Sequence, residues 1–230
     1  MTALLFALAL LPRPLACLEK YYGIKALCDD QGCRARLSDG SEIPYDDGQK
    51  KSPEERLEHP DVEDVFAQRY RSGPIRPVVE VDFDPGRVRL ESLLQLSYPK
   101  SGLAKIDLLG KKLTVHQKAA AAFGRVGARL SRIKDPSVKP FLEKLGGTYV
   151  PRNIAGTDRK SAHSWGISID LNPSLTHYWR WQKGGWKNTV PQSIVDAFEA
   201  EGFIWGGRWY HFDTMHFEYR PELLDPTCYP

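Results

Sequence analysis

Apolar and polar residues alternate over residues 167–171, where two isoleucines and a leucine are separated by a serine and an aspartate. This period of two predicts a half-buried strand whose open face carries Asp170. His163 lies an odd number of positions before Asp170, so a single straight strand would point the two side chains to opposite faces. Gly166 resolves the conflict, because a turn at a glycine lets His163 approach from a loop before the strand.

A similar alternation follows in residues 213–218. It predicts a second strand in which His216 and Glu218 share one face, while the apolar residues beside them point to the other. Asp213 would then lie in the loop that precedes this strand. The two predicted strands gather histidines and carboxylates, the side chains that bind metals and move protons.

Helical periodicity and capping residues predict helices ahead of and between these strands. A short helix is expected to begin at Ser52, because a serine N-cap is followed by a proline and two acids in the first turn. Further helices are expected over residues 87–97, 116–130, 140–145 and 191–200, with a hairpin that pairs 106–108 with 113–115. Helices first and short strands afterwards predict an α+β fold, a small antiparallel sheet with helices packed on one side.

Composition and charge are ordinary for a soluble globular protein. The chain has 230 residues, of which 27% are charged, and its formal net charge is only +3. We expect no nucleic-acid partner, because the basic residues are scattered among nearly as many acids. Residues 34–80 are polar and rich in turn-forming residues, so turns and loops are expected there rather than a core. We treat 17–80 as an N-terminal extension that packs on a catalytic domain at 81–230 and could line its cleft.

The first residues indicate export. Residues 2–11 form an apolar run that is too short to span a bilayer as a helix, and small residues follow it. This pattern predicts a signal peptide over residues 1–16 with cleavage near Ala16. Cys17 directly after that point raises the alternative of a lipid anchor, which Pro14 argues against. We therefore expect a periplasmic or secreted bacterial protein without a membrane span.

The chain has four cysteines, a number that fits an oxidising compartment. The close spacing of Cys28 and Cys33 predicts a small disulfide loop. A structural zinc site is the alternative, but no second close pair of cysteines or histidines accompanies them. Cys17 and Cys228 lie near opposite ends of the chain, and spacing alone cannot decide how the four cysteines pair.

Three side chains form a ligand set for one zinc ion. His163, Asp170 and His216 supply two nitrogens and an oxygen, and a catalytic zinc with three protein ligands keeps a fourth position for a water whose pKa it lowers to about 7. Asp213, just before the second histidine, is placed to accept a proton from that water as a general base. Glu218 is expected either to orient a ligand or to be an acid on the strand surface.

Further side chains near these segments are candidates for holding a substrate. Arg152 is the first candidate for stabilising the charge of a tetrahedral intermediate or gripping a substrate carboxylate, and Arg159 is the second. Ser161 would donate a hydrogen bond to substrate or brace the neighbouring histidine, and His211 could touch substrate. Five tryptophans crowd the last third of the chain and are expected mainly in the core, while Trp209 is expected to wall the cleft.

These residues form a recognisable motif, Ser161-x-His163-x-x-Gly166-x-x-x-Asp170 followed by Asp213-x-x-His216. It resembles the zinc D-Ala-D-Ala carboxypeptidases of the VanY type, and more closely their L-alanyl-D-glutamate endopeptidase branch. The resemblance covers residues 86–224 and implies a hedgehog/DD-peptidase fold that cleaves the stem peptides of bacterial peptidoglycan. By position it also implies that the two histidines and Asp170 bind zinc, that Asp213 is the base, and that Arg152 lies near the substrate-binding arginine of the family.

One departure from the carboxypeptidases bears on the reaction. They usually place a glutamate before the last histidine, whereas this chain has Asp213, as the endopeptidases do. Our main hypothesis is therefore a zinc peptidase, with an endopeptidase favoured over a carboxypeptidase. The alternative is a non-catalytic, zinc-containing module that binds peptidoglycan. Asp213 argues against that alternative, because a protein that only binds has no need of a base beside the metal.

Overall fold

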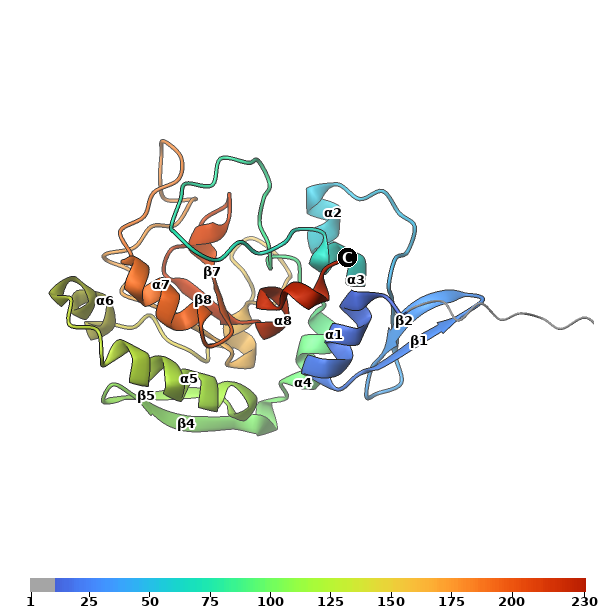
Figure 1. The fold of residues 1–230 in the computed structure, drawn as a ribbon, viewed down its shortest axis with the longest axis horizontal. Coiled ribbons are helices and arrows are strands. Elements are labelled where there is room, and N and C mark those ends of the chain that lie inside the picture. The colour runs from blue at the N-terminus through green and yellow to red at the C-terminus, as the bar shows by residue number, and fades with distance from the viewer. Residues whose placement is uncertain (1–10) are drawn as a thin grey trace, which may run out of the picture.

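Three small antiparallel sheets and eight α-helices make up the computed structural model, which describes residues 11–230 (Figure 1). The sheets are β1–β2–β3 (Lys25–Asp29, Gly32–Arg36, Glu42–Pro44), the hairpin β4–β5 (Leu103–Leu108, Lys111–His116) and β6–β8–β7 (Ser168–Asp170, His216–Tyr219, Phe203–Trp205). The helices are α1 (Arg13–Tyr22), α2 (Pro53–Glu58), α3 (Val62–Phe66), α4 (Glu91–Ser97), α5 (Gln117–Leu130), α6 (Lys139–Glu143), α7 (Gln192–Glu199) and α8 (Pro221–Leu224). The α+β class expected from the sequence is confirmed.

The larger of two hydrophobic cores lies between the β6–β8–β7 sheet and helices α5 and α7. Phe217 of β8 stacks on Phe198 of α7 with ring centroids 4.1 Å apart, and Phe203 of β7 meets Phe123 of α5 at 4.7 Å. Successive side chains of a strand alternate between its faces, so this packing turns His216 away from the helices. The apolar face of the sheet thereby positions the polar face that carries the predicted site.

A second core corrects the expectation that residues 34–80 form turns and loops rather than a core. Val62 and Phe66 of α3 are buried together with Leu15 of α1 and with Tyr229 at the other end of the chain. Apolar residues are sparse in this segment, and the core they form is completed by residues from both ends of the chain. Local sequence could not show this burial. We retain the division near residue 80 as a proposal, although this core draws on both sides of it.

The extension is joined to the C-terminal end by a covalent bond. Cys17 of α1 and Cys228 form a disulfide across a sequence separation of 211 residues, and Figure 1 shows the C-terminus beside α1 and α3. The predicted disulfide between Cys28 and Cys33 is also present, where it links paired positions of β1 and β2. The sulfur of Cys17 is thus used in a disulfide, not left free for a lipid.

Two sequence-level expectations about helix starts had different outcomes. The helix expected at Ser52 is confirmed, because Ser52 Oγ accepts from the Glu55 amide at 3.2 Å and Glu55 Oε2 accepts from the Ser52 amide at 2.7 Å. The helix expected over residues 87–97 starts only at Glu91. Residues 87–90 are not helical, and Arg89 within them reaches a buried acid in the site described below.

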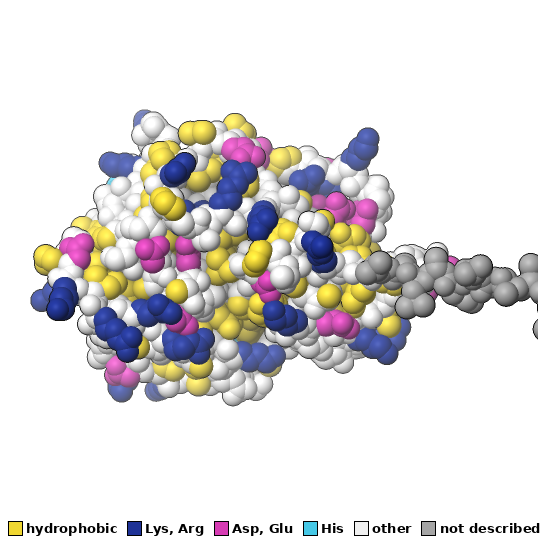
Figure 2. All heavy atoms as spheres, in the orientation of Figure 1, with side chains coloured by type: hydrophobic (Ala, Val, Ile, Leu, Met, Phe, Trp, Pro, Cys, Tyr) yellow, Lys and Arg dark blue, Asp and Glu magenta, His cyan; other side chains and the backbone are white. Residues whose placement is uncertain are grey.

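The N-terminal run expected to form the signal-peptide core falls largely on residues 1–10, which lie outside the described residues. The expected cleavage point near Ala16 lies within α1. Among residues 11–230, the structure has no helix with the length and apolar character needed to cross a bilayer. On the face shown in Figure 2, lysines and arginines are interspersed with acids rather than gathered in one patch.

Candidate metal centre

Strand pairing brings Asp170 and His216 together. They are register partners in the β6–β8 ladder, and directly opposite residues of antiparallel strands point their side chains to the same face. His216 Nδ1 lies 3.0 Å from Asp170 Oδ1, and His163 Nε2 lies 3.1 Å from the same oxygen. One ligand atom from each of the three residues falls within 4.8 Å of the others. The predicted ligand set therefore converges in space.

His163 enters the centre from a short 3-10 turn, Ala162–Trp165, that ends at Gly166. Gly166 has a φ of +67°, and its amide donates to the His163 carbonyl at 3.2 Å. A Cβ at this position would lie 2.9 Å from the backbone nitrogen of His116. Both the left-handed conformation and the close approach to β5 require glycine here. The odd spacing between His163 and Asp170 predicted the turn at this glycine.

Hydrogen bonds on the far side of each ring decide which histidine nitrogen faces the centre. His163 Nδ1 lies 2.9 Å from the Thr148 carbonyl, which can only accept, so Nδ1 carries the proton and Nε2 keeps its lone pair. Nε2 is buried and makes no hydrogen bond to any described residue. His216 Nε2 faces Glu218 Oε2 at 3.3 Å, which leaves Nδ1 for the centre. Two imidazole nitrogens and a carboxylate oxygen form a donor set that suits zinc.

The electrostatics of the centre favour a bound cation. Burial alone would raise the pKa of Asp170, but His163 and His216 outweigh it and hold that pKa below its usual range. Burial alone would lower the pKa of His216, whereas its hydrogen bonds to Asp170 and Glu218 raise the pKa to about 9. Zinc would have to displace the proton that His216 shares with Asp170, so its binding should release protons.

Glu218 lies fully buried beside His216 and not on the strand surface. Arg89 donates to both of its oxygens, from Nε at 2.9 Å and from Nη2 at 2.5 Å, and Arg220 Nη1 approaches at 3.3 Å. Burial alone would raise the pKa of Glu218, but the two arginines hold it well below its usual range. Arg89 was not predicted as a site residue, because the spacing of nearby apolar residues suggested a helix. The sequence could have indicated Arg89 only indirectly, because a buried glutamate such as Glu218 requires a cationic partner somewhere in the chain.

Asp213 reaches the centre from the loop between β7 and β8. Its amide donates to the Gly206 carbonyl at 3.0 Å, and a Cβ on Gly206 would stand 2.4 Å from the Asp213 carbonyl oxygen. Asp213 Oδ1 is buried and makes no hydrogen bond to any described residue. Burial and the charge of Asp170 raise the pKa of the Asp213 carboxyl to about 7. Asp213, Asp170 and His216 line one cavity of about 290 Å³.

Comparison with known proteins agrees with this geometry. Residues 155–219 match a protein family described as D-alanyl-D-alanine carboxypeptidase. This match supports the resemblance of residues 155–219 to the VanY-type peptidases. The matched segment is well under half of the 230-residue chain, but it contains all three residues of the metal group. No solved structure matches the chain.

Four of the five predicted substrate residues line the cavity of the metal group: Arg152, Ser161, Trp209 and His211. Arg152 and Ser161 line the same cavity as Asp213. The Ser161 amide donates to the Arg152 carbonyl at 3.1 Å, which ties the two together. Arg152 is exposed, and its charge partly offsets the rise in the pKa of Asp213 that burial and Asp170 cause. Arg152 itself falls just before the matched segment.

The other candidates are held in different ways. Trp209 is buried, donates from Nε1 to the Pro85 carbonyl at 2.7 Å, and packs its ring 5.9 Å from that of His216. His211 Nδ1 lies 2.6 Å from Asp84 Oδ2 at the edge of the cavity. Arg159 does not line this cavity but points toward α2, where its Nε lies 3.2 Å from Glu58 Oε1. The structure thus separates Arg159 from the residues around the metal group.

Aromatic residues border the mouth of the cavity. Tyr178, Trp179 and Trp181 all line it, and the Trp181 side chain is 67% exposed. In contrast, Trp165 and Trp205 are fully buried in the larger core. Of the five tryptophans expected mainly in the core, Trp205 and Trp209 are buried, whereas Trp179, Trp181 and Trp186 are not. The tryptophans therefore divide between the core beneath the sheet and the walls of the cleft.

Proposed function

We propose that this chain is a zinc-dependent peptidase that hydrolyses peptide bonds in the stem peptides of bacterial peptidoglycan. One observation carries the proposal. The histidine nitrogens and Asp170 oxygen converge on one point, and the carboxylate of Asp213, with no hydrogen-bond partner for Oδ1 among the described residues, lines the same cavity. The family match of residues 155–219 supports the same conclusion.

His163, Asp170 and His216 would hold the ion, which when bound supplies a Lewis acid for the scissile carbonyl and acidifies water. Asp213 would take the proton of the attacking water and pass it to the leaving amine. Arg152 would stabilise the negative charge that develops on the substrate or bind its carboxylate. Ser161 would hydrogen-bond the substrate beside it.

The proposal also specifies which peptide bond is cleaved. Asp213 stands where the carboxypeptidases usually carry glutamate, so we propose L-alanyl-D-glutamate endopeptidase activity, with D-Ala-D-Ala carboxypeptidase activity as the alternative. We place the protein in the periplasm or outside the cell. The two disulfides support this location, because such bonds persist in oxidising compartments.

Digestion of purified muropeptides, read by mass spectrometry, tests the proposal. Wild-type protein and Asp213→Asn would each be assayed with and without zinc, and zinc binding would be measured in both. Release of stem peptides from muramyl L-Ala would identify an endopeptidase, and loss of terminal D-Ala a carboxypeptidase. Either activity should disappear in Asp213→Asn while zinc stays bound. A wild type that binds zinc and muropeptides but cuts neither bond would instead be a non-catalytic binding module.

A further inference from the structure

One exposed tryptophan lies at the mouth of the metal cavity. Trp181 is 67% exposed and is the one mostly exposed aromatic side chain among residues 11–230. Tyr178 and Trp179 line the cavity beside it, with the Tyr178 ring in edge contact with both neighbours. We call these three residues the aromatic rim. Exposed apolar groups gathered at a cavity mark a binding surface, because covering them removes apolar area from water.

Backbone pairing fixes the aromatic rim beside the proposed base. Tyr178 and Asp213 are antiparallel bridge partners, and the Trp179 amide supports this pairing by donating to the Phe212 carbonyl at 2.9 Å. Directly opposite residues point their side chains to the same face, and Tyr178 and Asp213 both line the cavity. The Trp181 amide donates to the Tyr178 carbonyl at 2.9 Å, and the two rings lie 5.1 Å apart. Trp181 is therefore held close to the place where the base acts.

We propose that the aromatic rim binds the muramyl sugar to which the stem peptide is attached, with Trp181 as the main contact. The proposal rests on the function proposed above and extends the substrate from a peptide to a glycopeptide. A pyranose ring has a face made of C–H groups, whose weak positive polarity suits the negative face of an aromatic ring. Packing the two faces together also removes apolar area of both from water.

The length of the substrate fits this placement. In a substrate cut at the L-Ala-D-Glu bond, one alanine separates the scissile bond from the muramyl sugar. An extended residue spans about 3.5 Å, so the sugar lies only just outside the cavity that holds the bond. The aromatic rim borders that cavity and begins at Tyr178, directly opposite the base. In the alternative D-Ala-D-Ala bond, most of the stem peptide separates the scissile bond from the sugar, so the aromatic rim would not reach the sugar.

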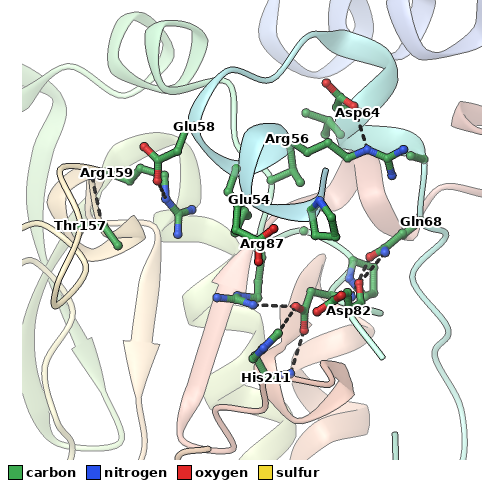
Figure 3. A pocket seen from close by; sticks show the side chains of 18 of the residues that line it. Glu54, Arg56, Glu58, Asp64, Gln68, Asp82, Arg87, Thr157, Arg159 and His211 are labelled. Atoms are coloured by element: carbon green, nitrogen blue, oxygen red, sulfur yellow. Dashed lines mark hydrogen bonds and ion pairs between the residues drawn. The ribbon is translucent and has the colours of Figure 1, made fainter. Parts of the chain in front are cut away.

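A larger cavity of about 460 Å³ lies beside α2, and its walls suit the face of a sugar less well (Figure 3). Charged side chains are frequent there and pair with one another. Arg87 Nη1 lies 2.6 Å from Asp84 Oδ2, and Arg159 Nε lies 3.2 Å from Glu58 Oε1. Of the aromatic rim only Trp179 lines this larger cavity, whereas all three residues line the metal cavity. The aromatic surface for a sugar is therefore at the metal cavity.

Calorimetry with two matched ligands tests the proposal without relying on turnover. One ligand is a stem peptide whose L-alanine is N-acetylated, and the other is the same peptide attached to N-acetylmuramic acid, so neither has a free amino group on the alanine. Both are titrated into zinc-loaded Asp213→Asn. We expect the muramyl peptide to bind about ten-fold more tightly, which corresponds to an aromatic contact of about 1.4 kcal/mol. Adding Trp181→Ala should remove this preference and leave binding of the acetyl peptide unchanged.

Two further variants separate the aromatic contact from other effects. Trp181→Phe keeps an aromatic face and should retain most of the preference. Leu175→Ala, at an exposed apolar residue that does not line the cavity, should leave the preference unchanged. The proposal is overturned if the muramyl peptide binds no more tightly than the acetyl peptide, if the preference survives Trp181→Ala, or if Trp181→Ala weakens both ligands equally.

The outcomes for the aromatic rim and for the peptidase can be told apart. A preference that depends on Trp181, combined with no cleavage of either ligand by the wild-type protein, would uphold the sugar contact and refute the peptidase. Cleavage of both ligands by the wild-type protein with equal kcat/KM would uphold the peptidase and refute the sugar contact.

Discussion

Arg89 Nη2 lies 2.5 Å from Glu218 Oε2, and both side chains are buried. Glu218 faces the ring of His216, so Arg89 acts on the metal centre through two intermediaries without touching it. Arg89 is therefore a positioning residue. Arg89 holds Glu218 in place, and Glu218 in turn holds the ring of His216 in its orientation.

Replacing Arg89 should weaken zinc binding more than its distance from the ion suggests. Arg89→Gln removes the two short hydrogen bonds that the guanidinium donates to the buried Glu218 and leaves the longer contact from Arg220, which we expect to cost about 3–5 kcal/mol of stability. Zinc affinity should fall about 10–100-fold, which is typical when a residue that supports a metal ligand is replaced. Chemical denaturation and competition with a chromophoric chelator measure the two effects. Unchanged zinc affinity in folded Arg89→Gln would contradict the positioning role, and Arg132→Gln serves as the exposed control.

Gly166→Ala should destabilise the protein by more than the cost of a left-handed residue. That cost is about 1–2 kcal/mol, and the added Cβ would also meet backbone of β5 at 2.9 Å. Gly23→Ala is a matched control, because Gly23 has a φ of +68° and an added methyl group there would have nothing within 4 Å. The difference between the two variants in urea denaturation isolates the close approach at the site. Equal losses would mean that the backbone accommodates the methyl group.

Glu201 should contribute stability that depends on pH. It accepts from Arg125 and Arg129 of α5, each at 2.5 Å. Burial alone would raise the pKa of Glu201, but these hydrogen bonds outweigh it and lower the pKa from 4.5. A lowered carboxyl pKa stabilises the fold above the unfolded-state pKa, and the contribution disappears as pH falls through the folded-state value.

Glu201→Gln should therefore lower stability by about 1 kcal/mol at pH 7, a modest value because both arginines are half-exposed. The difference from wild type should shrink as the pH is lowered below about 4.5, the usual range of a glutamate pKa. Denaturation curves across pH check this sign. Glu143→Gln, whose partner Lys139 lies 3.9 Å away in an exposed pair, should change little at any pH.

The two disulfides should differ in their contribution to stability. Cys17–Cys228 spans 211 residues and Cys28–Cys33 only 5, and closing a longer loop removes more entropy from the unfolded chain. We expect the double variant Cys17→Ala, Cys228→Ala to lose about 2–5 kcal/mol. The matching pair of changes at Cys28 and Cys33 should cost less. Thermal unfolding of both double variants makes the comparison, and a larger loss from the short loop would contradict it.

The local order of residues was enough to predict the parts of the site that lie on regular elements. The period of two placed Asp170 and His216 on strands, and the odd spacing to His163 required the turn at Gly166 that the structure shows. These features follow from strand geometry and glycine conformation, which depend on neighbours along the chain. The convergence of His163, Asp170 and His216 could therefore be predicted from the sequence.

Contacts between segments that are distant in the sequence decided the parts of the site and of the fold that local patterns did not predict. Thr148 and Arg89 support the two histidines from outside the strands, and Arg159 turned toward Glu58 of the extension and away from the metal group. No pattern along the chain marks such partners, because they are chosen by how separate elements pack. The same is true of the second core, where α1, α3 and the C-terminus each supply too few apolar residues to be recognised alone. Burial arises only when those surfaces meet, and that meeting is a property of the tertiary structure.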